Sequence, residues 1–169
     1  ATLDELAAKA RELTKDDKYG FAFAYTNGYA MAAILHAFGG GMLDQKGRPI
    51  IDSPENVAAI KWVKQLRDEG LVPREIDSAL TSSLFNSRKA AMIFQGPWFL
   101  KDIKPGVPYA VAPIPRGPAG PARPFLGVEA LIMTATGKHK REALEVMLAL
   151  TSDESALIRL QKAQQPVAN

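Results

Sequence analysis

Apolar residues recur at helical spacing in several parts of the chain. Over residues 2–13 they fall three and four positions apart, which predicts an amphipathic helix. Thr2, with Glu5 three residues later, has the signature of a capping box at its start. A second stripe follows Ser53 and predicts a helix to about Glu69, with proline at its first position. Further helices are predicted over 29–38, 76–87, 97–101, 138–150 and 153–161.

Short apolar runs between these helices predict strands at 21–25, 90–94, 109–112 and 125–134. The first run ends at the turn Thr26-Asn27-Gly28, and residues 42–51 have the pattern of an irregular hairpin. Residues 113–124 contain five prolines and two glycines, which predicts a loop. Alternating strands and helices indicate an α/β or α+β layered fold with four or five short strands.

Composition agrees with a globular protein. The chain has 169 residues, 47% of them hydrophobic and 23% charged, which suits one domain, or one domain and a further piece. The net charge is +3 and the charges are interspersed, so no nucleic-acid surface is expected.

Several kinds of site are not expected. Cysteine is absent and there are two histidines, His36 and His139, so neither a metal site nor a cofactor is predicted. No apolar run approaches the roughly 18 residues of a membrane span, and no signal peptide is recognised. Because the sequence opens within a predicted helix, we interpret it as a portion of something longer.

Catalytic motifs are also missing. Neither a nucleophile elbow nor a phosphate-binding P-loop occurs, and Gly39-Gly40-Gly41 follows a predicted helix, as a structural corner would. Most carboxylates lie on helix faces that water would cover. Glu129 differs because it interrupts the apolar run 125–134. It is either a strand end paired with a basic side chain or a hydrogen-bond acceptor lining a cleft.

Two aromatic residues carry the functional signal. Tyr29 and Trp98 each begin a helix directly after a predicted strand and turn. In open α/β sheets, ligands bind at the carboxyl ends of strands, where such junctions gather. A flat ring there can stack on the apolar face of a sugar, while nearby polar groups bind its hydroxyls. The alternatives are a packing role at the helix start for Tyr29 and a core position for Trp98.

The stretch around Trp98 is similar to a known family. Its residues are Phe85-Asn86-Ser87-Arg88-Lys89-Ala90-Ala91-Met92, then Gly96-Pro97-Trp98. They resemble a characteristic stretch of the extracellular solute-binding proteins of ABC sugar importers, most of all the maltose/maltodextrin-binding type. Arg88 departs from the glycine that is usual in that family. The resemblance covers essentially the whole sequence but only about the middle half of a full-length member.

The resemblance implies a type II periplasmic binding-protein fold, a clamp of two lobes joined by a hinge. Residues 1–125 would form a C-terminal-lobe-like sugar-binding core. Residues 126–169 would be a hinge strand and helices that pack on the other lobe in the full-length protein. The resemblance implies stacking roles for Tyr29 and Trp98, and the full set of expected ligand-binding residues is Asn27, Tyr29, Gly96, Pro97, Trp98 and Glu129. Asn27 and Gly28 replace the glutamate and proline found in some members.

The resemblance also implies partners and a location. These are an oligosaccharide, the missing N-terminal lobe, and the membrane permease of an importer, in the periplasm or at the cell surface. Two other functions stay open. A carbohydrate-active enzyme needs two convergent carboxylates, of which only Glu129 is a candidate. An isolated structural fragment would have little or no sugar affinity. The apolar stripes beyond residue 126 are expected to fold back or to self-associate.

Overall fold

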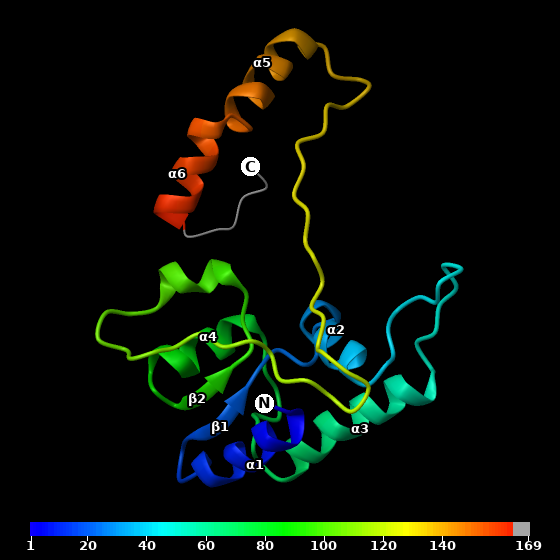
Figure 1. Ribbon diagram of the computed structural model, residues 1–169. Helices are drawn as coiled ribbons and strands as arrows, with labels where there is room; N and C mark the ends of the chain where they lie inside the picture. Colours follow the sequence, from blue (N-terminus) through cyan, green and yellow to red (C-terminus); the bar gives the residue numbers. More distant parts are fainter. Residues whose placement is uncertain (164–169) are drawn as a thin grey trace. The chain divides into compact units, whose positions relative to one another are not determined.

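Helices predominate among the described residues, and two short strands lie between them (Figure 1). The computed structural model describes residues 1–163. In chain order the elements are α1 (Leu3–Leu13), β1 (Tyr19–Ala22), α2 (Gly28–Ala37), α3 (Pro54–Asp68), α4 (Ser78–Asn86), β2 (Ala90–Ile93), the 3-10 helix η1 (Pro97–Asp102), α5 (Lys140–Leu150) and α6 (Asp153–Ala163). Every predicted helix is present within three residues of its predicted bounds.

Side-chain caps set the beginnings of these helices. The Thr2 hydroxyl accepts a bond of 3.1 Å from the Glu5 N–H, and the Glu5 carboxylate accepts one of 2.7 Å from the Thr2 N–H. At the start of α3 the Ser53 hydroxyl accepts a bond from the Asn56 N–H, and at the start of α4 the Asp77 carboxylate accepts one from the Leu80 N–H. Each cap accepts a hydrogen bond from a backbone N–H that has no partner inside the helix, so the helix begins directly after the capping residue.

The two strands form a small parallel sheet. Tyr19 pairs with Ala90 and Phe21 with Met92, and α1 packs beside β1 while α4 packs beside β2 (Figure 1). Phe21 and Phe23 are fully buried, and their rings lie 5.0 Å apart between centroids, with Phe94 beside both. Because the two strands are parallel, the segments that follow β1 and β2 both leave the sheet at its carboxyl end.

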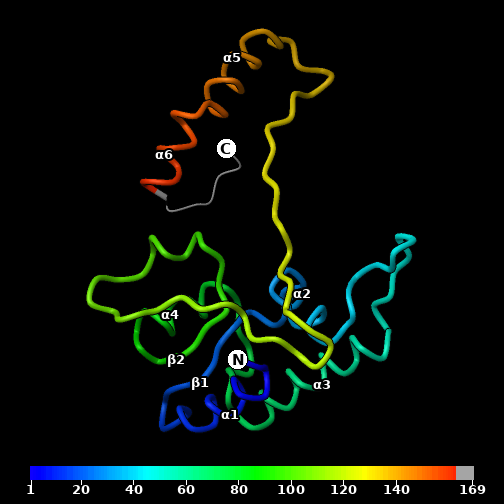
Figure 2. Tube along the Cα trace, in the orientation of Figure 1, coloured from blue at the N-terminus to red at the C-terminus, as the bar shows by residue number. Residues whose placement is uncertain are grey.

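Two predicted strands are wrong. Residues 109–112 and 125–134 lie in a long stretch without regular secondary structure, visible as a plain trace in Figure 2. Within 126–134, Leu126 is 91% exposed and Ile132 84%. An apolar run becomes a strand only where a neighbour completes its hydrogen bonds. The described residues supply no such neighbour here, so the expected four or five strands reduce to two.

The chain divides into two compact units. The first consists of residues 1–95 and 104–125, and the second of residues 96–103 and 126–169, of which 164–169 lie outside the described residues. In the second unit α5 and α6 are joined by hydrogen bonds, including one of 2.6 Å from Arg159 to the Leu150 carbonyl. The assignment of 1–125 to a C-terminal-lobe-like core, and of 126–169 to a hinge strand and helices that pack on the other lobe, stays a prediction.

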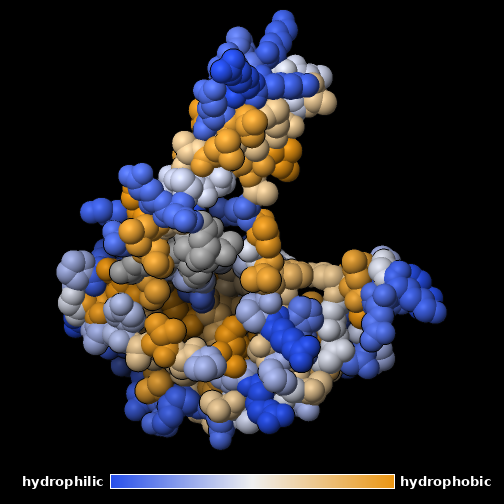
Figure 3. Space-filling model, turned by 45° about the horizontal axis from the view of Figure 1, so that its top comes forward, coloured by the Kyte–Doolittle hydropathy of each residue, from blue (hydrophilic) through white to orange (hydrophobic). Residues whose placement is uncertain are grey.

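Both helices of the second unit expose apolar side chains. Figure 3 shows them as an orange patch on α5 and α6. The residues are Leu144, Val146, Leu148, Leu150, Leu157, Ile158 and Leu160. No residue of α5 is buried, although the helix has the amphipathic pattern of one that packs against a neighbour.

Candidate functional site

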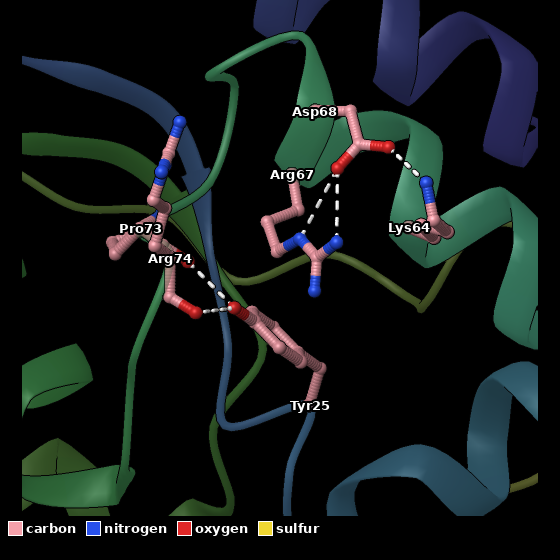
Figure 4. Close-up of polar contacts among 6 residues, drawn as sticks. All are labelled: Tyr25, Lys64, Arg67, Asp68, Pro73 and Arg74. Carbon is pink, nitrogen blue, oxygen red and sulfur yellow. Dashed lines mark hydrogen bonds and ion pairs between the residues drawn. The ribbon is translucent and has the colours of Figure 1, made fainter.

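The turn after β1 is fixed by hydrogen bonds to a distant segment (Figure 4). The Tyr25 hydroxyl lies 2.8 Å from the Pro73 carbonyl and also contacts the Arg74 carbonyl, and burial raises the pKa of this phenol. The Thr26 hydroxyl donates to the Ile76 carbonyl at 3.2 Å. These contacts hold the residues immediately before Tyr29, so the start of α2 has a defined position.

Asn27 and Tyr29 lie together at that start. The Asn27 side-chain oxygen accepts a bond of 2.8 Å from the Tyr29 N–H and so caps α2. Asn27 therefore has a structural role in addition to any role toward a ligand. Tyr29 is 43% exposed. About two fifths of the Tyr29 surface is therefore accessible to solvent.

Gly96, Pro97 and Trp98 form a second group, at the start of η1. Pro97 is the first helical residue, where a missing N–H costs nothing. A Cβ on Gly96 would overlap the indole of Trp98, so the ring lies directly over the Gly96 backbone. Trp98 is 41% exposed, which is incompatible with a position deep in a core. Its proposed contact with a ligand stays a prediction.

Glu129 lies in the extended stretch 126–134 and is exposed. It does not interrupt a strand, so the cost of placing a carboxylate within a sheet does not arise. Asn27 and Tyr29 belong to the first compact unit, whereas the other four predicted residues belong to the second. The structure therefore groups the predicted residues as one pair, one triplet and Glu129.

Sequence reasoning missed a segment that lies along α2. We call residues 119–125 the strap, and three contacts join it to the helix. The Ala119 N–H donates to the Ala37 carbonyl at 3.0 Å, His36 Nδ1 lies 2.5 Å from the Arg123 carbonyl, and the Tyr29 hydroxyl lies 3.4 Å from the Phe125 carbonyl. The yellow trace passes beside α2 in Figures 1 and 2. The sequence predicts Phe125 as the start of a strand and contains no signal that places it next to Tyr29.

A cavity of about 350 Å³ opens between α2 and α3. Its walls are mainly apolar, with Met31, Leu35, Met42 and Ile60 among them, and Lys64 and Arg67 add two cations. Both cations contact Asp68 (Figure 4), and their hydrogen bonds lower the pKa of that carboxyl. None of the six predicted ligand-binding residues lines this cavity.

Within residues 1–163 no group of three or more histidine or acidic side chains is arranged to hold a metal ion. Among the helices that the structure describes, none is long and apolar enough to cross a membrane.

Known proteins resemble this chain over nearly its whole length. A maltotriose-binding protein from Pyrococcus abyssi is 32% identical over 150 residues, which is 84% of this chain. The maltose/maltodextrin-binding domain MalE from Bdellovibrio bacteriovorus, solved with maltotriose, superimposes with a TM-score of 0.89 over 96% of this chain at 26% identity. The maltotriose-binding protein of Thermus thermophilus gives a TM-score of 0.81 over 95% of the chain at 29% identity.

These relatives are longer than the chain. The chain spans 32% of the Pyrococcus protein and 46% of each of the two solved structures. The shared architecture confirms the predicted α/β, type II periplasmic binding-protein fold. Residues 1–157 match the family described as bacterial extracellular solute-binding protein. The chain therefore belongs to the bacterial extracellular solute-binding protein family.

Proposed function

We propose that this chain is the sugar-binding lobe of a solute-binding protein for maltodextrin-type oligosaccharides. The observation that carries the proposal is the exposed aromatic residue that follows each strand of the parallel pair. Tyr29 follows β1 and Trp98 follows β2, and each is about two fifths exposed. Family membership and the sugars named for the similar proteins support the same class of ligand.

The chemistry of the site is recognition without bond cleavage. An indole or phenol ring offers a flat apolar surface to the C–H face of a pyranose, and polar groups nearby bind its hydroxyls. Asn27, at the capped start of α2, and Glu129 are the polar side chains assigned to this task. Hydrolysis would need a pair of carboxylates at a defined separation, and this lobe is proposed to have no such role.

The full-length protein acts in this proposal outside the cytoplasm, as a clamp that closes on the sugar and delivers it to the permease of an ABC importer. The second lobe supplies the opposing contacts. Closure stabilises the bound state only when both lobes touch the ligand. We therefore expect this chain alone to bind more weakly than the complete clamp.

Isothermal titration with maltose, maltotriose and trehalose tests the proposal. We expect weak, saturable heat with at least one sugar, and its loss in Trp98→Ala with the fold retained by circular dichroism. The matched control is Trp62→Phe, which alters the other tryptophan, a residue of α3 packed against Phe38. Absence of heat at millimolar sugar would leave the chain as a structural fragment without affinity.

The enzyme alternative has its own measurement. Maltotetraose is incubated with the chain and reducing ends are counted over time. No increase above buffer is expected, and steady release of product that depends on Glu129 would overturn the assignment as a binding lobe.

A further inference from the structure

The strap runs antiparallel to α2 and ends beside Tyr29, the proposed sugar-contact residue. Its first residue bonds to Ala37 at the end of the helix, its middle to His36, and its last to Tyr29 at the beginning. Pro121 and Pro124 each fix one backbone angle within it. A segment tied at three points and stiffened by proline can hold its final side chain in one place.

That side chain is Phe125, and its ring contacts two aromatic neighbours on α2. The centroids of the Phe125 and Tyr29 rings are 5.7 Å apart with the planes inclined by 40°. The His36 and Phe125 rings are perpendicular, with their centroids 6.1 Å apart and their planes at 88°. Both centroid distances fall in the range of aromatic pairs, and the perpendicular contact with His36 is one of the arrangements that such pairs favour. Phe125 keeps 40% of its surface exposed, so its contacts with α2 are lateral rather than those of a core residue.

An exposed tyrosine at a helix start has several side-chain rotamers available to it. Stacking on a sugar requires one of them, and selecting it on binding costs conformational entropy. The contact with Phe125 and the hydroxyl contact with the strap backbone both restrict the Tyr29 ring before any ligand arrives. Restriction of this kind raises affinity without adding a contact to the ligand.

We propose that Phe125 is a positioning residue that orients the Tyr29 ring for stacking, and that His36 holds Phe125 in place through the strap. The inference rests on the proposed function, because it concerns the use of Tyr29 in sugar binding. His36 acts through Nδ1–H, which donates to the Arg123 carbonyl, and through the perpendicular contact of its ring with Phe125.

A double-mutant cycle on maltotriose binding, measured by saturation-transfer NMR titration, tests this inference. Phe125→Leu keeps an apolar side chain but removes the aromatic contact, and it should weaken binding roughly two- to tenfold. In the Tyr29→Ala background the same change should have no further effect, because its consequence passes through Tyr29. Tyr109→Leu, an exposed aromatic change outside the strap, is the matched control.

Conservative variants separate positioning from general stability. Phe125→Tyr keeps the ring and should retain wild-type affinity, whereas His36→Ala should weaken binding in the same direction as Phe125→Leu. Thermal unfolding of each variant checks that the fold is intact. Equal effects of Phe125→Leu in the wild-type and Tyr29→Ala backgrounds, or no effect in either, would overturn the inference.

Failure of the proposed function gives a different result. In that case wild type shows no maltotriose binding, or Tyr29→Ala leaves the affinity unchanged. Binding that Tyr29→Ala weakens and Phe125→Leu does not would instead keep the sugar-binding proposal and remove the positioning role of Phe125.

Discussion

At the scale of single residues, Gly96 shows how one missing side chain shapes a site. The Trp98 indole lies where a Cβ on residue 96 would stand, so the ring can adopt its position only above a glycine. The backbone angles of Gly96 are ordinary for any residue, with φ at −84°. The requirement for glycine here is therefore one of space, not of backbone conformation.

Gly96→Ala should displace the indole and lower maltotriose affinity roughly two- to tenfold, the range set by loss of an aromatic contact. In a Trp62→Phe background the fluorescence reports Trp98 alone, and its emission maximum should shift. Gly41→Ala is the control, because a Cβ there meets its nearest neighbour at an ordinary 3.6 Å. An unchanged emission spectrum and affinity in Gly96→Ala would contradict the steric argument.

At the scale of elements, helices could be predicted from interactions between residues close in sequence, whereas strands could be predicted only in part. Helix starts could be predicted because capping residues such as Thr2 and Ser53 bond to backbone N–H groups only three residues later in the sequence. Strands depend on partners remote in sequence, so an apolar run such as 125–134 has the composition of a strand without its hydrogen bonds. The contact between Phe125 and Tyr29 could likewise not be predicted, because the two residues are 96 positions apart in sequence and Phe125 lies in an irregular segment.

Limited proteolysis distinguishes a strand from an extended coil at 126–134. Exposed segments without backbone pairing are preferred cleavage sites, so a glutamate-specific protease should cut first after Glu129, giving fragments 1–129 and 130–169. Helical glutamates such as Glu12 should resist longer, and Glu129→Gln should remove the first cut. Initial cleavage inside α1 or α3 would mean that residues 126–134 are protected in solution.

At the scale of the whole molecule, the most prominent feature is that the apolar faces of α5 and α6 are exposed to solvent. Leu148 is 62% exposed, and its neighbours on the patch are similarly open. Contiguous apolar surface of this kind marks an interface or leads to association. In a complete family member we propose that the other lobe covers it.

Sedimentation velocity at several concentrations measures the consequence for this chain. We expect the mean mass to rise with concentration as copies associate through these faces. The double variant Leu148→Glu with Leu157→Glu should sediment as a monomer, while Leu43→Glu, an equally exposed change in the first unit, should behave as wild type. A wild-type chain that stays monomeric throughout would show that the patch does not drive association.

The parallel register has a consequence for synthesis on the ribosome. Because Tyr19 must pair with Ala90, the nascent chain cannot close its sheet until the second strand has left the exit tunnel. Until then Phe21 and Phe23 have no strand beside them, and the apolar surface that they carry is open to chaperones. Pairing over such a sequence distance slows folding. The sheet of the first compact unit can therefore form only after β2 emerges, and Trp98 leaves the tunnel shortly after that strand.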